Sequence, residues 1–259
     1  MTDKPTDIIS ADDKIICSVD INAIKIIAGQ QTKTVFQNLH FQFESGFVYA
    51  ILGKNGTGKT TLLNSISKLL DEKSYCIEGN ISVGHNNVLA CSDEELQFIR
   101  KNIVRNIFQD PQNLFDPLKK VGYYFQDSIA ADKNKLDELF DYFLLPNTER
   151  VLDFYPHELS IGMAQRVAFI LGFISEPKLL LLDEPNSSLD LPISNLLSQK
   201  LVEFARKKLT CIVFTTQDIN FAIKTADKII LLKNSGSLEY YNSPADQEQL
   251  KKVLIENLN

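Results

Sequence analysis

A glycine-rich stretch between two apolar segments constrains this sequence more than any other feature. Residues 53–61 read G-K-N-G-T-G-K-T-T, preceded by an apolar run at 47–52 and followed by a segment of helical periodicity at 62–70. A buried strand that enters a glycine-rich turn and leaves as a helix is the context of a phosphate-binding P-loop. The sequence therefore predicts a binding site for a nucleoside triphosphate at this turn.

Each residue type in this stretch has a physical role in holding phosphate. Glycines let successive backbone N–H groups point into one concavity, and the helix that follows adds its free N–H groups and dipole. The ammonium of Lys59 is expected on the β- and γ-phosphates, and the hydroxyl of Thr60 on Mg²⁺. The alternative is a glycine-rich turn that binds nothing. The residues expected to contact the nucleotide here are Gly53, Lys54, Asn55, Gly56, Thr57, Gly58, Lys59, Thr60 and Thr61.

Composition narrows the class of protein. The chain has 259 residues, of which 44% are hydrophobic, enough for one large domain with a substantial core. The net charge of −6 argues against nucleic acid as the main partner. The four cysteines form no C-x-x-C pair, so we expect neither a metal site nor disulfides, as in a reducing cytosol. The polar N-terminus and the lack of long apolar runs predict neither a signal peptide nor a membrane span.

Strand-like and helix-like segments alternate along the chain, which is typical of a parallel α/β sheet. We expect a flexible extension at 1–13 and one domain at 14–259, with a helical block at 117–175 inserted into the sheet. Ser92 and Glu95 form a capping box that begins a short helix. Strands are predicted at 15–27, 34–43, 75–83 (broken at 78–80), 103–108, 178–182, 210–215 and 228–233, and helices at 160–175, 192–207, 219–226 and 244–258.

Two acidic residues end one of the apolar strands. Asp183 and Glu184 directly follow the run K-L-L-L-L at 178–182. In open α/β sheets ligands bind at the carboxyl ends of the strands. We therefore expect Asp183 to hold Mg²⁺ through water and Glu184 to take a proton from the attacking water. The alternative is a pair of solvated acids in a loop, which the P-loop earlier in the chain makes less attractive.

Five stretches resemble, in residues and in order, the motifs of an ABC-type ATPase. Residues 53–60 match its Walker A motif and 179–184 its Walker B motif. F-Q-D-P at 108–111 resembles the Q-loop, and S-S-L-D at 187–190 resembles the D-loop. L-S-I-G-M at 159–163 resembles the signature motif, usually L-S-G-G-Q. The signature discriminates most, because Walker A is shared by many nucleotide-binding proteins.

This resemblance implies a fold and further site residues. The fold would be α/β: a P-loop NTPase core with a parallel sheet, an antiparallel β subdomain and a helical subdomain at about 117–175. ATP and Mg²⁺ would be the cofactors. The N-terminus of the helix at Ser160 would bind the γ-phosphate held by a second ATPase subunit, although these residues alone also fit an ordinary helix N-cap. The implied nucleotide contacts beyond the P-loop are Ser160, Gly162 and Asp190, and the implied metal ligands are Thr60, Gln109 and Asp183.

Two longer stretches are similar to the ATPases of peptide and nickel importers. These are I-F-Q-D-P-Q-N-L-F-D-P at 107–117 and Y-P-H-E-L-S-I-G-M-A-Q-R at 155–166. The similarity implies an ATP-hydrolysing subunit at the cytoplasmic face of the cell membrane, serving small solutes such as peptides or nickel chelates. Its partners would be transmembrane permease subunits, a second ATPase subunit and, indirectly, a solute-binding protein. Asn113, Leu114 and Phe115 are candidates for docking the permease, and the alternative for Leu114 and Phe115 is core packing.

Three positions depart from the family pattern. Ile161 stands where a glycine is usual, Gln217 stands where the switch histidine is usual, and no aromatic residue stands near Ile27 to stack on adenine. Gln217 remains a catalytic candidate, because it donates a hydrogen bond. The departures favour an alternative function: a degenerate subunit that gates a heterodimeric transporter while its partner hydrolyses ATP. A homodimer stays open. A third alternative, a soluble ABC protein acting on ribosomes or DNA, lacks support in this single acidic domain.

Overall fold

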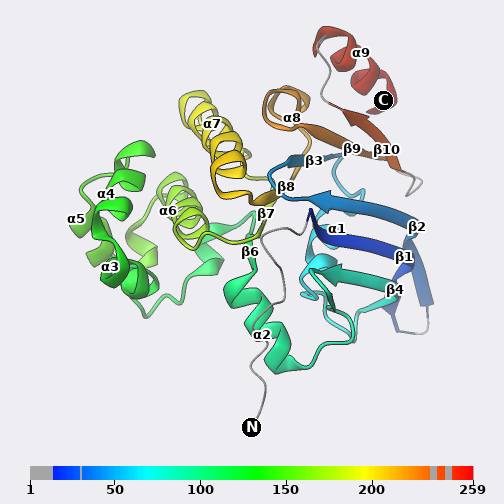
Figure 1. The fold of residues 1–259 in the computed structure, drawn as a ribbon, viewed down its shortest axis with the longest axis horizontal. Helices are drawn as coiled ribbons and strands as arrows, with labels where there is room; N and C mark the ends of the chain where they lie inside the picture. Colours follow the sequence, from blue (N-terminus) through cyan, green and yellow to red (C-terminus); the bar gives the residue numbers. More distant parts are fainter. Residues whose placement is uncertain (1–13, 30, 234–237, 243–246, 259) are drawn as a thin grey trace.

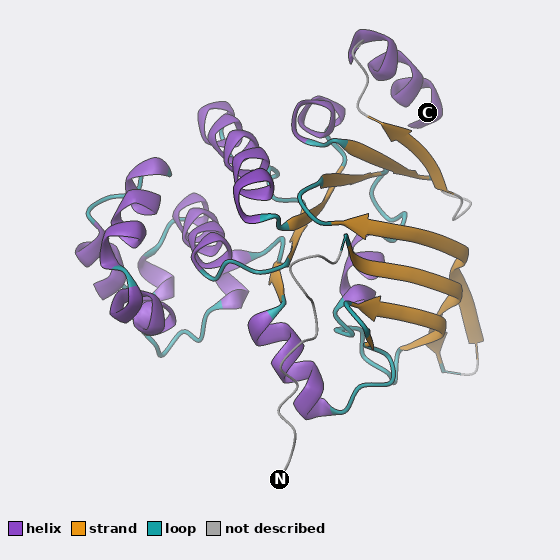
Figure 2. Ribbon diagram, viewed as in Figure 1, coloured by secondary structure: helices purple, strands orange, loops and turns teal. Residues whose placement is uncertain are grey.

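The computed structural model describes residues 14–29, 31–233, 238–242 and 247–258, so the extension expected at 1–13 lies outside the described residues. Two sheets and the helices around them make up the described part (Figure 1, Figure 2). The strands are β1 (Ile15–Ala28), β2 (Gln31–Glu44), β3 (Val48–Leu52), β4 (Tyr75–Val83), β5 (Asn86–Asn87), β6 (Val104–Ile107), β7 (Leu179–Asp183), β8 (Cys211–Thr216), β9 (Lys228–Leu232) and β10 (Leu238–Asn242). The α-helices are α1 (Lys59–Ile66), α2 (Asp93–Asn102), α3 (Gln126–Ala131), α4 (Lys133–Tyr142), α5 (Thr148–Asp153), α6 (Ile161–Ile174), α7 (Leu191–Lys208), α8 (Ile219–Thr225) and α9 (Gln247–Leu258), and the 3₁₀ turns are η1 (Pro111–Leu114), η2 (Val121–Phe125) and η3 (Pro156–Glu158).

The larger sheet has the strand order β10-β9-β3-β8-β7-β6. Strands β9, β3, β8, β7 and β6 run parallel, and β10 pairs antiparallel with β9 at one edge. Every residue of β3, β7 and β8 is buried. Their nearly unbroken apolar sequences are what a parallel sheet covered on both faces requires. The predicted parallel sheet is confirmed, whereas β10 was not predicted.

Each face of this sheet has its own hydrophobic core. On one face Ala50 of β3 packs in a cluster with side chains of α6, α7 and α8. On the other face Tyr49 and Ile51 of the same strand pack in a cluster with Leu62 of α1 and with the smaller sheet. Figure 1 shows α7 and α8 on one side of β3 and β8, and α1 with β1 and β4 on the other. The turn between β3 and α1 is thereby fixed at both of its ends.

The smaller sheet is antiparallel, with the order β2-β1-β4-β5, which confirms the expected antiparallel subdomain. The predicted break of the strand at 78–80 is wrong. Residues Glu78, Gly79 and Asn80 stay paired with β1, and the irregularity is taken up instead by a register shift between Ile21 and Ala23 of β1. A bulge can change the register of one strand without ending its partner.

The chain leaves the larger sheet after β6 and returns at the neighbouring strand β7. Helices α3, α4 and α5 lie between them in sequence and gather around α6 at one end of the molecule (Figure 1). Aromatic side chains hold this group together: Phe125 contacts Phe140, and Phe143 stacks on Phe173 of α6. The expected limits of a helical subdomain at 117 and 175 stay a prediction. The capping box at the start of α2, Ser92 with Glu95, is confirmed.

Candidate active site

The turn between β3 and α1 exposes the N-terminus of α1. Gly58 is the N-cap, with a φ of +94°, and a Cβ on it would lie 2.5 Å from Cζ of Phe36. Only glycine fits such a position without strain. Within the described residues no side chain caps α1, and its first turn contains no acidic residue. Thr60 is exposed and Thr61 half-buried at this end. An uncapped helix N-terminus suits an anion, because its N–H groups need an acceptor.

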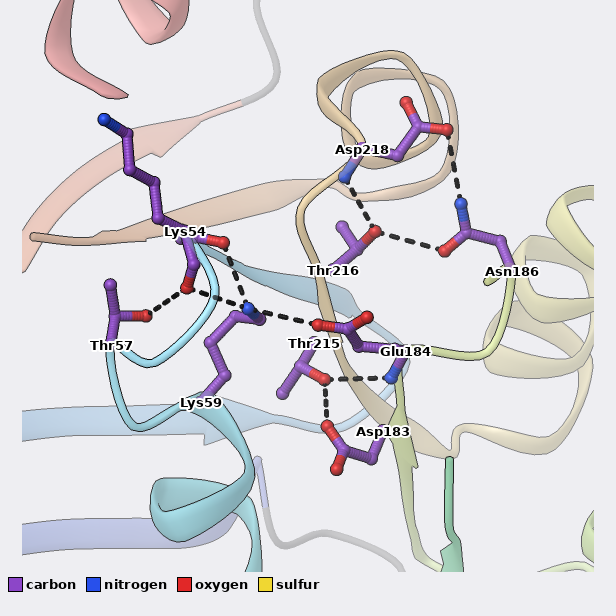
Figure 3. Close-up of polar contacts among 10 residues, drawn as sticks. Lys54, Thr57, Lys59, Asp183, Glu184, Asn186, Thr215, Thr216 and Asp218 are labelled. Carbon is purple, nitrogen blue, oxygen red and sulfur yellow. Dashed lines mark hydrogen bonds and ion pairs between the residues drawn. The ribbon is translucent and has the colours of Figure 1, made fainter. Parts of the chain in front are cut away.

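The ammonium of Lys59 lies at the centre of the site (Figure 3). Lys59 is only 5% exposed, and its Nζ donates to the carbonyl oxygens of Gly53 and Lys54, both at 3.1 Å. The same Nζ lies 3.1 Å from Oε1 of Glu184. These three oxygens compensate the lost hydration of the buried charge. Phosphate oxygens would take over part of this role when a nucleotide binds.

The two acids that follow β7 are held by the neighbouring strand. Thr215 of β8 donates through Oγ1 to Oδ1 of Asp183 and accepts, at 3.0 Å, the N–H of Glu184. Asp183 and Glu184 are 4% and 8% exposed, so they are not solvated loop residues. Glu184 has a φ of +44°, in the left-handed region that residues with a side chain rarely adopt. This backbone brings its carboxylate to Lys59.

Gln217 lies close to the turn between β3 and α1. It is exposed at the end of β8 and lines an open cavity of about 410 Å³, to which the P-loop also contributes. The structure thus places Gln217 in one cavity with the P-loop, and its role as the switch residue stays a prediction. The P-loop residues that line this cavity are Gly53, Lys54 and Asn55.

A second set of hydrogen bonds joins the loop after β7 to the loop after β8 (Figure 3). Thr216 donates through Oγ1 to Oδ1 of Asn186 at 3.1 Å, and Asn186 donates through Nδ2 to Oδ2 of Asp218 at 3.2 Å. The N–H of Asp218 donates back to Oγ1 of Thr216 at 3.0 Å. Sequence reasoning missed Asn186, Thr215 and Thr216. The available signal was the pair of hydroxyl residues that ends the otherwise apolar strand β8.

The start of α6 differs from the start of α1. Ser160 is the N-cap, and its Oγ accepts the N–H of Met163 at 3.2 Å, so the N-cap interpretation holds for its local structure. Ile161 is 57% exposed. A Cβ on Gly162 would meet no atom within 4 Å, and its φ is not in the left-handed region. The chain's own packing therefore gives no reason for glycine at this position.

Asp190 caps the next helix. Its Oδ1 accepts the N–H of Ile193 at 3.0 Å at the start of α7. Asp190 also faces Arg166 of α6: burial lowers the pKa of the Arg166 guanidinium, and the charge of Asp190 raises it in part. Asp190 thus has a structural role in this chain, and its contact with nucleotide stays a prediction.

The predicted metal ligands fit Mg²⁺ when phosphate is present. Gln109 is exposed after β6, at the same sheet edge where Asp183 ends the neighbouring strand β7. Among the described residues no cluster of three or more His, Cys, Asp or Glu side chains could hold a metal by itself. Mg²⁺ in proteins is commonly bound by one or two carboxylates together with substrate phosphates and waters. Thr60 and Asp183 supply one hydroxyl and one carboxylate, which matches that pattern.

A groove of about 340 Å³ lies between β6, η1, α3 and α6. Phe115 also lines this groove, but it is 4% exposed and its ring packs edge-on against Tyr124, which favours the core interpretation. Leu114 is half-buried and lines the groove, together with the charged residues Arg105 and Asp127. The side chain of the third docking candidate, at position 113, lies outside the described residues.

Comparisons with known proteins agree with this geometry. A family model described as ABC transporter matches residues 36–187. The oligopeptide transport ATP-binding protein OppD of Bacillus subtilis (strain 168) is 30% identical over 205 residues, which cover 76% of this chain and 57% of OppD. OppD of Lactococcus lactis subsp. cremoris (strain SK11) is 28% identical over 214 residues, which cover 80% of this chain and 63% of the relative. The chain thus spans less than two thirds of either relative.

Solved structures with a similar fold include the dimeric structure of MJ0796, a bacterial ABC transporter cassette. Its identity to this chain is 24%, with a TM-score of 0.76 over 89% of this chain and 100% of the cassette. The structure of cbiO1 from Clostridium perfringens has 24% identity and a TM-score of 0.71, over 94% of this chain and 96% of cbiO1. At this level of identity the likeness shows the fold alone, and it confirms the predicted α/β cassette.

Proposed function

The chain belongs to the ABC transporter family, and from this premise we propose that it is an ATP-hydrolysing subunit of an importer for small solutes. The names of its relatives favour peptides over nickel chelates as the solute. One observation carries the proposal: the buried ammonium of Lys59 lies 3.1 Å from the carboxylate of Glu184, beside the uncapped start of α1. A fixed cation, free N–H groups and a neighbouring base are the parts that ATP hydrolysis needs.

The residues of this chain would act in the following way. The phosphates of ATP attract the ammonium of Lys59 away from the carbonyl oxygens that it now contacts, and the N–H groups of α1 bind the same phosphates. Glu184, released from its ion pair, accepts a proton from the attacking water. Thr60, Asp183 and Gln109 would hold Mg²⁺, which supplies positive charge at the β- and γ-phosphates. Gln217 donates a neutral hydrogen bond from the facing side of the cavity.

The start of α6 supports a second ATPase subunit as a partner. Glycine in a helix is less stable than alanine by about 0.5–1 kcal/mol, and Gly162 has no neighbour in its own chain that would require it. A contact from outside the chain explains why the space is kept. We propose that Ser160, Gly162 and Asp190 contact the ATP held by the second subunit, in a heterodimer or a homodimer. The side chain of Ile161, 57% exposed, would then point at the partner.

Attachment to the membrane would go through the groove lined by Leu114. Among the helices that the structure describes, none combines the length and apolar character needed to cross a membrane. The lining of the groove combines apolar side chains with the charged residues Arg105 and Asp127, which fits a short amphipathic helix. We propose that permease subunits dock here at the cytoplasmic face of the membrane, and that a solute-binding protein acts through them.

The decisive experiment is to capture the chain from solubilised membranes and identify what co-purifies. MgATP turnover is then measured for the chain alone and in that complex. Permease subunits together with turnover support the proposal. If the chain bound no ATP and no membrane protein co-purified with it, the proposal would be overturned.

The alternative, a degenerate subunit that closes on ATP while its partner hydrolyses it, is favoured by one observation: the neutral Gln217 lines the cavity. Under this alternative the complex turns over ATP at a rate that does not change when Glu184 is replaced by Gln.

A further inference from the structure

We infer that Thr215 is a positioning residue that sets the geometry of both acids after β7. The inference rests on the proposed function, because it concerns how the predicted Mg²⁺ ligand Asp183 and the predicted base Glu184 are held. Thr215 itself touches neither nucleotide nor metal in this scheme. It acts through its two neighbours on β7.

The hydroxyl of Thr215 makes one hydrogen bond to each of the two acidic residues (Figure 3). Thr215 is 0% exposed, donates its proton to Oδ1 of Asp183 and accepts the N–H of Glu184 at 3.0 Å. A threonine hydroxyl has a single proton to donate. Because that proton goes to Asp183, the lone pair that meets Glu184 has a fixed direction. One side chain therefore orients a carboxylate and a backbone amide at the same time.

For Asp183 the consequence is a defined carboxylate orientation. The bond from Thr215 engages Oδ1, and the described residues give Oδ2 no hydrogen bond. Oδ2 thus remains available for a water on Mg²⁺. Without the hydroxyl, the carboxylate would lose a charge-assisted hydrogen bond in a site where only 4% of Asp183 is exposed. Its side chain would then be less well fixed, and the metal would be held less tightly.

For Glu184 the consequence concerns the backbone. Its φ of +44° is rare for a residue with a side chain, and its N–H is buried beside β8. Thr215 supplies the acceptor that this N–H needs, since a buried N–H without a partner is costly. This conformation directs the carboxylate of Glu184 to a point 3.1 Å from Nζ of Lys59. Thr215 therefore helps to set the distance between the predicted base and the predicted phosphate cation.

Packing alone does not call for a hydroxyl at this position. Strand β8 is buried at every residue, and valine has nearly the same shape as threonine and suits a buried strand well. A valine here would serve the sheet as well as the neighbouring Val213 does. The hydroxyl is thus explained by its two bonds to the site and not by the core.

The test compares Thr215→Val with Thr215→Ser, which keeps the hydroxyl. The matched control is Thr210→Val just before the other end of β8, where a buried hydroxyl donates to the carbonyl of Pro177 at 2.8 Å. ATP affinity of the full chain is measured by calorimetric titration, once with Mg²⁺ and once with EDTA, and melting temperatures are recorded. We expect Thr215→Val to weaken MgATP binding about tenfold, because the loss of a hydrogen-bond partner behind a metal ligand typically lowers metal affinity about 10- to 100-fold, and to leave affinity in EDTA unchanged.

Thr215→Ser is expected to restore most of the lost MgATP affinity, and Thr210→Val to change neither affinity. MgATP binding by Thr215→Val that equals that of the unmodified chain would overturn the inference. So would an equal loss with Mg²⁺ and with EDTA, or a loss that Thr215→Ser fails to restore, because either result indicates a general structural effect. An unmodified chain that binds no ATP under either condition would overturn the proposed function, and this inference with it.

Discussion

The turn that begins α1 and the turn that begins α6 are both built around a glycine, but their surroundings differ. Around Gly58 the chain leaves no room for a Cβ, because Phe36 would lie 2.5 Å away. Around Gly162 the space is open to 4 Å. The first glycine is required by the fold of its own chain, whereas the second is not. The packing of its own chain therefore accounts for the glycine of the first turn, whereas our proposal accounts for the glycine of the second by a contact with a partner subunit.

Polar contacts repeat the contrast. Lys59, at the first turn, forms a buried ion pair with Glu184, which follows β7. The N–H of Glu184 donates in turn to the hydroxyl of Thr215. The second turn presents the exposed Ile161, and its polar residue Ser160 is satisfied by its own helix. We therefore expect substitutions in the first turn to act on binding and chemistry within one chain. Substitutions in the second turn should change ATP turnover only when two ATPase subunits come together.

The largest expected effect belongs to Glu184→Gln. Loss of a general base typically lowers turnover by about 10²–10⁴-fold, and glutamine keeps the shape of the side chain. ATP binding should persist, and the ATP-bound dimer should last longer. Turnover in the membrane complex is the measurement. Glu176→Gln is the control, because this glutamate also pairs with lysines, Lys135 and Lys208, but precedes β7, whereas Glu184 follows it. Unchanged turnover by Glu184→Gln would show that this site is silent.

Lys59→Ala is expected to have the next largest effect. It removes the ammonium that lies 3.1 Å from Glu184, and charge-assisted bonds of this kind are worth roughly 1.5–3 kcal/mol. The affinity for MgATP should fall about tenfold or more. Equilibrium titration of the lone chain measures it, since the first turn needs no partner. The exposed Lys73→Ala serves as control. If Lys59→Ala lowered the affinity for MgATP only in the dimer, the first turn would not bind ATP by itself, and the two turns would not differ in this respect.

Gln217→His tests whether the neutral Gln217 slows ATP hydrolysis at the site that it shares with the first turn. A neutral donor in place of a charged one costs on the order of 1–2 kcal/mol in the transition state, so histidine should speed turnover about 5- to 30-fold. The gain should be larger at pH 6 than at pH 8, because imidazole is protonated below about pH 6.5. Ile161→Gly, in the second turn, should add a gain only in a dimer. Fast turnover by the unmodified lone chain, insensitive to both changes, would contradict an asymmetric pair.

Much of this architecture could be predicted because its signals are local. The apolar run of β7, the capping box of α2 and the glycine-rich turn each occupy a few consecutive residues, and the structure has them where expected. The strand β10, with the sequence L-E-Y-Y-N, was missed because a short half-exposed edge strand has little apolar pattern. For Phe115 both docking and core packing were left open, because sequence does not distinguish an apolar docking residue from a core residue.

The supporting residues of the site could not be predicted, since they depend on contacts between distant parts of the chain. Thr215 meets Asp183 across 32 positions, and Asn186 meets Asp218 across 32 positions, only because β7 and β8 are neighbours in the sheet. A parallel α/β pattern predicts that the carboxyl ends of the strands lie at the same edge of the sheet. It does not predict which strands are neighbours. The acids themselves could be found from one strand end, whereas the residues that hold them required the register of two strands.

The smallest expected effects are the changes in the free energy of unfolding caused by Gly58→Ala and Gly162→Ala. They test most directly whether the two glycines differ in being required by their own chain. At Gly58 the φ of +94° should make alanine destabilising by about 1–2 kcal/mol, with the clash against Phe36 in addition. At Gly162, in the first turn of α6, the same change should stabilise the chain by at most about 0.5–1 kcal/mol, the value for the middle of a helix, because alanine is the better helix former. Urea unfolding of the two variants measures both signs.

Gly162→Ala should nonetheless slow ATP turnover in the assembled complex, since the new methyl group occupies the space that the chain itself leaves open. A variant that is more stable alone and less active in the dimer can be explained only by a contact outside the chain. If Gly162→Ala stabilised the chain and turned over ATP in the complex at the unmodified rate, the open space would serve no partner. The start of α6 would then be an ordinary capped helix, and the composite site would have to be abandoned.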